Sequence, residues 1–259
     1  MRVVPAKNGW KWLLKGFDLF RKSPAMWLFL VITYWIGVAM LGQIRYVGLA
    51  ASTVLLPAFS VSFMVMCAAL DTGGALQPAL LFSGFRREPA RMLTLGLFYL
   101  VSIFAVLGMA SVADSGALLQ WVILGEEPPL EVLREGSVSQ ALMLAALAGT
   151  PVLMAFWFAP VLAAWGRMGA AQSLFYSFFA VWRNWRAFCV YGAMLALAGT
   201  VFLVTVTLAA IVTQGQLQTL RFLALVLTLL TLPIVFGSFY ASYRDIFPEN
   251  EPPANAPTA

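Results

Sequence analysis

The sequence predicts an all-α polytopic membrane protein with six transmembrane helices, and three observations lead to this fold class. Apolar residues make up 61% of the 259 residues, against roughly 45–50% in soluble domains. Charged residues make up only 10%, against about 25% in soluble domains. The mean hydropathy is +0.86. Because so few charges cannot cover the apolar surface of a soluble domain, the composition favours a bilayer as the solvent.

Six segments contain no Asp, Glu, Lys or Arg and have about the 20 residues that a bilayer-spanning helix needs. Only Arg45 separates the first two, so we expect a tight hairpin between them. The apolar run that follows the basic first residues is long and lacks a cleavage pattern, so we expect a retained span rather than a signal peptide. The segments are Ala25–Ile44, Tyr46–Leu70, Met92–Ala113, Val138–Trp165, Ala187–Thr213 and Phe222–Tyr243.

The basic residues gather on one side of this predicted bilayer. Thirteen lie in segments on the side of the first residues, and three lie on the other side. Because Lys and Arg are enriched in cytoplasmic loops, we expect both termini to be cytoplasmic. The thirteen are Arg2, Lys7, Lys11, Lys15, Arg21, Lys22, Arg86, Arg87, Arg91, Arg167, Arg183, Arg186 and Arg244, and the three are Arg45, Arg134 and Arg221.

Two polar segments lie outside the spans. The loop between the third and fourth spans carries Asp114, Glu126, Glu127, Glu131 and Glu135. We interpret it as a solvated loop, with a cation-binding loop as the alternative. Residues 248–259 are rich in proline and poor in apolar side chains, which predicts a disordered cytoplasmic tail.

The cytoplasmic segments repeat a short pattern, Phe-x-x-aromatic-Arg, before each odd-numbered span. The copies are Phe17–Arg21, Phe82–Arg86 and Phe179–Arg183. This pattern predicts one membrane domain, residues 1–247, built from three pseudo-repeated units of an interfacial amphipathic helix and a two-span hairpin. The units are residues 1–71, 72–166 and 167–247.

The first interfacial helix separates apolar from charged side chains at helical spacing. We therefore expect it to lie in the inner headgroup layer, with its lysines toward anionic lipid. The apolar face is Trp10, Leu13, Leu14, Phe17 and Phe20, and the charged face is Lys11, Lys15, Asp18 and Lys22. The residues we single out as lipid-headgroup contacts are Arg21, Arg86, Arg183, Lys11 and Lys15, with membrane lipid as the partner. Simple interfacial anchoring is the alternative interpretation of these side chains.

The spans contain features that favour bending and close packing. Pro57, Pro151, Pro160 and Pro233 lie inside them and are expected to kink the helices. Small residues spaced four apart, Ala145-x-x-x-Gly149 and Gly237-x-x-x-Ala241, favour close contact between helices. We read both features as structural.

The chain carries little that predicts catalysis. It has no histidine, which excludes the most common general base and the most common metal ligand. We expect no cofactor, no metal, no catalytic residue and no nucleic-acid partner. A membrane enzyme built on Asp71, Asp245 and Arg244 is the remaining alternative, although Arg244 and Asp245 are more simply read as a pair that anchors the end of the last span. We expect Cys67 and Cys189 to be small buried hydrophobes.

Two resemblances bear on the architecture. The segments Val4–Leu13 and Phe239–Phe247 resemble a family of uncharacterised proteobacterial six-span inner-membrane proteins, over essentially the whole chain. This resemblance implies a multi-pass protein of the bacterial inner membrane. The Leu56-Pro57 and Leu232-Pro233 pairs are distantly similar to the membrane domain of some glycerophosphodiester phosphodiesterases. That likeness carries over no hydrolase activity, because those catalytic domains use histidines.

The hypotheses for function are therefore of different classes. The favoured one is a non-enzymatic accessory or organising protein that acts through lipid or protein partners. The alternative is a passive or partner-powered carrier or scramblase for lipids or hydrophobic small molecules, whose path the span hydroxyls would line. Neither the substrate nor the oligomeric state follows from the sequence.

Overall fold

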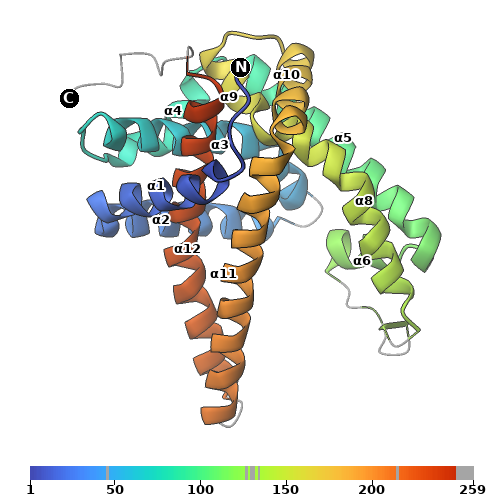
Figure 1. Cartoon of the computed structure of the whole chain (residues 1–259). Coiled ribbons are helices and arrows are strands. Elements are labelled where there is room, and N and C mark those ends of the chain that lie inside the picture. The colour runs from blue at the N-terminus through green and yellow to red at the C-terminus, as the bar shows by residue number, and fades with distance from the viewer. Residues whose placement is uncertain (45–46, 126–127, 129–131, 134, 214–215, 249–259) are drawn as a thin grey trace. The chain divides into compact units, whose positions relative to one another are not determined.

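The computed structural model describes residues 1–44, 47–125, 128, 132–133, 135–213 and 216–248 (Figure 1). Within these residues the regular secondary structure is entirely helical, which confirms the predicted fold class. Residues 249–259 of the predicted tail and the residues Arg45, Glu126, Glu127, Glu131 and Arg134 lie outside the described part. The elements are α1 (Asn8–Lys22), α2 (Pro24–Gly42), α3 (Val47–Asp71), η1 (Pro78–Phe82), α4 (Ser83–Arg86), α5 (Pro89–Asp114), α6 (Ala117–Leu124), α8 (Ser137–Trp157), α9 (Ala159–Trp165), α10 (Ala170–Arg183), α11 (Trp185–Val212) and α12 (Leu217–Ile246).

Six helical segments are long and apolar enough to cross a membrane, as the charge-free runs predict. They are Pro24–Gly42, Val47–Asp71, Pro89–Asp114, Ser137–Trp165, Trp185–Val212 and Gln218–Ile246. Several extend beyond the predicted segments because helix formation continues into polar residues at the span ends. Pro57, Pro151 and Pro233 lie inside α3, α8 and α12 without ending these helices.

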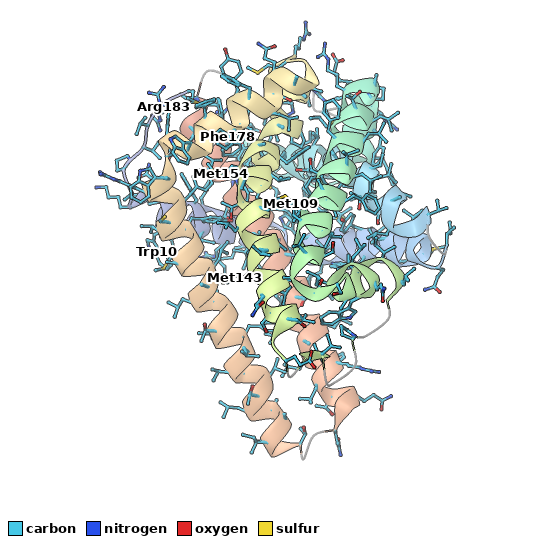
Figure 2. All side chains as sticks on the ribbon, turned by 90° about the vertical axis from the view of Figure 1, so that its right-hand side faces the viewer. Trp10, Met109, Met143, Met154, Phe178 and Arg183 are labelled. Atoms are coloured by element: carbon cyan, nitrogen blue, oxygen red, sulfur yellow. The ribbon has the colours of Figure 1, made fainter. Side chains whose placement is uncertain are left out.

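The fourth span is interrupted, and Pro160 is the reason. The helix stops at Trp157 and restarts at Ala159, with Pro160 in the first turn of α9. Proline has no N–H to donate and disfavours helical geometry in the residue before it. The Phe158 N–H released at this break donates to the Ser177 hydroxyl at 2.8 Å, and that hydroxyl donates to the Met154 carbonyl oxygen at 2.8 Å. Figure 2 labels Met154 on α8 and Phe178 next to Ser177 on α10.

The chain forms two compact units that are not contiguous in sequence. The first unit comprises residues 1–35, 62–81 and 180–259, and the second comprises residues 36–61 and 82–179. Helices α2 and α3 therefore contribute one part to each unit. This division differs from the three consecutive hairpins that the sequence predicts, and the pseudo-repeat stays a prediction.

The first unit is organised by contacts of α1 with the two long helices α11 and α12. Figure 1 shows α11 and α12 side by side, with α1 crossing them near the end where α12 finishes. The second half of α3 adds Phe63, whose ring stacks on Phe236 of α12 at a centroid distance of 4.0 Å. Trp27 and Tyr34 of α2 pack against the same Phe63 ring. Aromatic packing thus joins α2, α3 and α12 inside this unit.

The second unit is built on the pair α5 and α8, which run side by side (Figure 1). Leu107, Ala110, Leu118 and Ala141 form a buried cluster between α5, α6 and α8. At Gly96 of α5 a Cβ atom would lie 2.1 Å from the Val54 carbonyl oxygen, so α3 and α5 also pack closely here. Small residues allow such close contact between helices in a membrane.

Asp114 ends α5 and begins α6. Its buried carboxylate accepts hydrogen bonds from the Gly116 N–H at 3.0 Å and the Leu118 N–H at 2.6 Å. Gly116 directly precedes α6, and the Leu118 N–H lies in its first turn, where N–H groups have no partner within the helix. Among the loop acids of the predicted cation-binding alternative, Asp114 therefore acts as a helix cap, and Glu135 is exposed.

Candidate functional site

Helix α1 has a buried face that the sequence pattern does not predict. Gly9, Trp12, Gly16 and Leu19 are spaced three or four residues apart and are all buried. They face α11 and α12, which are the helices that α1 contacts most extensively. The pattern mixes two glycines with two large apolar residues, so it carries little hydropathy signal. The spacing of Gly9 and Gly16 by seven residues is the one sequence feature that points to it.

The glycines of this face bring backbones into direct contact. A Cβ atom at Gly9 would lie 2.3 Å from the Ala187 carbonyl oxygen of α11. A Cβ atom at Gly16 would lie 2.3 Å from the Ile234 carbonyl oxygen of α12, and Gly237 meets the Gly16 Cα in the same way at 2.8 Å. The predicted close contact at Gly237 is thus made, and its partner is α1.

The two outer faces of α1 match the predicted separation of apolar and charged side chains. Trp10, Leu14 and Phe17 expose 48%, 45% and 44% of their surface, and Figure 2 labels Trp10. Lys11 and Asp18 are exposed beside them. In water, an outward row of Trp, Leu and Phe would be costly, whereas at a membrane interface such side chains are stabilised.

Asp245, at the end of α12, holds the first residues of the chain and the start of α1. Its carboxylate forms an ion pair with Arg2. It also accepts hydrogen bonds from the Asn8 side-chain amide at 2.7 Å and the Trp12 indole N–H at 2.9 Å. The sequence interpretation paired Asp245 with its neighbour Arg244, and the structure corrects this, because the ion-pair partner comes from the other end of the chain.

Asn184, between α10 and α11, adds a second attachment for the first residues. Its side-chain oxygen accepts a hydrogen bond from the Val4 N–H at 2.8 Å, and its amide nitrogen donates to the Arg2 carbonyl oxygen at 3.2 Å. The Arg2 N–H donates to the Ile246 carbonyl oxygen at 2.9 Å. Residues 2–4 are therefore bound to the ends of both long helices.

Asp71, at the end of α3, holds the second half of α1. Its carboxylate forms an ion pair with Lys15 at 2.5 Å and accepts a hydrogen bond from the Tyr240 hydroxyl at 3.1 Å. Two turns of α1 further on, the Lys22 ammonium donates to the Leu70 carbonyl oxygen at 2.7 Å. These four side chains and the Arg244 side chain, which lies one helical turn beyond Tyr240, are called the Asp71 cluster below.

The structure does not combine the residues of the enzyme alternative into one constellation. Asp71 and Asp245 belong to separate networks, each with its own partners from α1. Arg244 forms an ion pair with neither of them, and its Nη1 atom is buried with no hydrogen-bond partner in the described part of the chain. Among the described residues there is also no group of three His, Cys, Asp or Glu side chains that could hold a metal ion.

The predicted headgroup residues have different surroundings. Lys11, Arg21, Arg86 and Arg183 are exposed, and Figure 2 labels Arg183 at the end of α10. The Arg21 guanidinium lies over the Phe17 ring, 5.7 Å from its centroid, on the outer side of α1. Lys15 is instead engaged in the ion pair with Asp71.

The second unit contains an open groove of about 430 Å³ between α5 and α8, with one wall residue from α10. Its lining is largely apolar, and Ser102 is the polar side chain in it. That hydroxyl donates to the Phe98 carbonyl oxygen of its own helix at 2.8 Å. The lining residues are Phe98, Val101, Ser102, Pro151, Val152, Ala155, Phe156 and Leu174.

The hydroxyl groups of the fifth span are hydrogen-bonded within their own helix. Thr200, Thr205 and Thr207 each donate to the carbonyl oxygen four residues earlier in α11, at 2.8–2.9 Å. Both cysteines are free thiols, and Cys67 is buried as predicted. The prediction of a buried side chain is wrong for Cys189, which is exposed on α11.

Comparison with known proteins supports the predicted architecture. A probable inner membrane protein of Burkholderia thailandensis is 34% identical to this chain over 260 residues, which cover 97% of this chain and 95% of the relative. No family model matches the chain, and no solved structure matches it. The likeness to the membrane domain of glycerophosphodiester phosphodiesterases therefore stays a prediction. With six candidate spans and this relative, the chain belongs to a family of multi-pass inner-membrane proteins that includes the Burkholderia protein.

Proposed function

We propose that this protein is a non-enzymatic organising protein of the inner membrane that acts through anionic lipid at the outer faces of α1. The observation that supports the proposal is that α1 is fixed to the rest of its unit by one face and exposes the other. One face packs against α11 and α12, while Trp10, Leu14 and Phe17 point outward. A free amphipathic helix leaves and re-enters a membrane surface, whereas this one presents a permanent apolar and basic surface.

Charge supports a lipid partner at this surface. Lys11 and Arg21 are exposed on α1, beside the outward apolar row. Each basic residue near an anionic membrane surface contributes about 1 kcal/mol to binding. We also infer that both termini are cytoplasmic, because thirteen of the sixteen basic residues lie on that side in the predicted topology.

The test compares lipid retention by matched charge variants. Lys11→Glu combined with Arg21→Glu reverses the exposed charge of the outer face, and Lys7→Glu with Arg186→Glu changes two exposed basic residues outside it. Each protein is reconstituted in vesicles of phosphatidylcholine with 30% phosphatidylglycerol, then extracted in mild detergent, and its retained lipids are counted by native mass spectrometry.

We expect the wild-type protein and the control to retain phosphatidylglycerol in excess over its share of the vesicle, and the α1 variant to lose that enrichment. Equal enrichment in all three proteins would contradict lipid recognition by α1. Stoichiometric capture of one protein from native membranes, unaffected by the α1 variant, would favour a protein partner instead.

A second candidate function, a carrier or scramblase for lipids or hydrophobic small molecules, is favoured by the groove of the second unit. The groove is apolar and belongs to two membrane-spanning helices, α5 and α8. Against it, the threonine hydroxyls of α11 are engaged within their own helix. Vesicles with fluorescent lipid test it: faster exchange between leaflets that Val152→Trp abolishes would favour the carrier, and a rate equal to that of empty vesicles would exclude a scramblase.

A further inference from the structure

The Asp71 cluster carries more positive than negative charge in a partly buried place. Lys15, Lys22 and Arg244 supply three cations, and Asp71 is the carboxylate to which the cluster is joined. Lys15 neutralises Asp71 directly at 2.5 Å. Lys22 instead donates to an uncharged group, the carbonyl oxygen of Leu70. Lys15 and Lys22 therefore share one carboxylate, and Arg244 has no ion-pair partner in the cluster.

Arg244 is the cation of the cluster that lacks a hydrogen bond at one guanidinium nitrogen. Its Nη1 atom is buried and has no hydrogen-bond partner among the described residues. Arg244 lies one helical turn beyond Tyr240, whose hydroxyl binds Asp71. Buried cationic groups in proteins are normally paired, because removing a charge from water is costly unless an anion compensates it. An anionic acceptor would therefore stabilise this guanidinium nitrogen, which has no hydrogen-bond partner among the described residues.

The N–H donors of Lys22 and Arg244 indicate which anion could bind. Lys22 uses one of its three N–H donors on Leu70, and the Arg244 guanidinium has five N–H donors in a planar fork. Such a fork matches the paired oxygens of a phosphate, and a nearby ammonium adds a point charge. Among the described residues, the neighbouring acid Asp245 does not occupy this place, since it is bound to Arg2, Asn8 and Trp12.

We propose that Arg244 and Lys22 form a binding site for a phosphate group beside the Lys15–Asp71 ion pair. The phosphate belongs either to a lipid headgroup at the membrane surface or to a free anion, and both sources share this chemistry. The site deepens the proposed function, on which its lipid form rests, but it uses residues other than Lys11 and Arg21.

The experiment measures binding to the purified full-length protein by native mass spectrometry with three probes. Dioctanoyl phosphatidylglycerol carries both acyl chains and phosphate, dioctanoylglycerol carries the chains alone, and inorganic phosphate carries the anion alone. The variants are Arg244→Gln, Arg244→Lys and Lys22→Gln. Arg186→Gln is the matched control, because Arg186 is an exposed arginine of the same unit that lies over the Trp185 ring.

We expect Arg244→Gln to weaken binding of the phosphate-bearing probe by roughly tenfold or more, which is the usual effect of losing a charged hydrogen bond. Lys22→Gln should weaken it less, Arg244→Lys should restore part of it, and the control should bind like wild type. Binding of phosphatidylglycerol but not inorganic phosphate identifies a lipid headgroup, and binding of both identifies a phosphate site open to free anions.

Two results would overturn the site. One is equal binding of phosphatidylglycerol and dioctanoylglycerol in wild type, which would show that the phosphate is not recognised. The other is wild-type affinity in both Lys22→Gln and Arg244→Lys. These two variants test the site even if Arg244→Gln does not fold. If the Lys11 and Arg21 variant loses its enrichment while the Arg244 and Lys22 variants bind like wild type, this site alone fails. If the Arg244 variants lose binding while the Lys11 and Arg21 variant keeps its enrichment, the proposed function alone fails.

Discussion

Replacing Gly16 by alanine tests whether the contact between α1 and α12 fixes the interfacial helix. The added Cβ atom would lie 2.3 Å from the Ile234 carbonyl oxygen and 2.6 Å from the Ser238 amide nitrogen. Both are backbone atoms of α12, so no side chain can move aside. Because ordinary contact starts near 3.4 Å, the two helices would have to separate locally by roughly 1 Å.

The magnitude follows from three opposing contributions. Alanine favours the helix over glycine by about 1 kcal/mol. Overpacking in a close contact costs about 1–3 kcal/mol. A separation of the helices would also stretch the hydrogen bond from Trp12 to Asp245, now 2.9 Å long, whose loss costs about 1–3 kcal/mol. The costs exceed the gain, and we expect a net destabilisation of about 1–5 kcal/mol.

Gly37→Ala provides the matched control for this substitution. Gly37 also lies within a helix, α2, and a Cβ atom there would meet nothing within 4 Å. It therefore gains the helix preference without the clash. In thermal unfolding followed by tryptophan fluorescence in mild detergent, we expect the Tm of Gly16→Ala to be roughly 4–20 °C below that of Gly37→Ala. Equal Tm values for the two variants would refute the close contact of α1 with α12.

Two further substitutions test the polar attachments. Asp245→Asn removes the charge that pairs with Arg2 and should destabilise the protein by about 1–3 kcal/mol relative to Asp18→Asn, an exposed acid of α1, in the same unfolding assay; no difference would show that the attachment of the first residues adds no stability. Ser177→Ala leaves the Phe158 N–H without its acceptor and should cost roughly 1–3 kcal/mol relative to the exposed Ser139→Ala, whereas equal stability would mean that the break in the fourth span is satisfied otherwise.

The six spans could be predicted from the sequence because their signal is local. A run of about 20 apolar residues without charge has few structural alternatives, whatever the rest of the chain does. The interruption at Phe158 could also have been predicted, since Pro160 lies two residues after it. Pro160 predicts a kink there. The hydroxyl that accepts the Phe158 N–H belongs to Ser177, in a helix that begins after the next loop, and no local pattern indicates it.

The attachment of α1 could not be predicted, because its signal is neither local nor apolar. Gly9 and Gly16 contribute almost nothing to a hydrophobic pattern, yet they set how closely α1 approaches two helices from the other end of the chain. The partner of Asp245 could not be predicted from its sequence neighbour either. Arg244 precedes Asp245 in sequence, but successive residues of a helix point in different directions, so Asp245 meets Arg2 instead.

The two acids at the ends of α3 and α12 explain why positive charge remains at this surface. Asp245 forms an ion pair with Arg2 near the start of α1. Asp71 forms an ion pair with Lys15 in the second half of α1. Each acid thus holds one part of the same helix and is neutralised in doing so. In the unit around α1, Lys11, Arg21, Lys22 and Arg244 are in none of the ion pairs that the described residues form. A protein that used these cations only for its own stability would pair them with its acids. Leaving Lys11 and Arg21 unpaired beside an outward row of Trp10, Leu14 and Phe17 favours a partner that brings negative charge and hydrocarbon together, which is the chemistry of an anionic lipid.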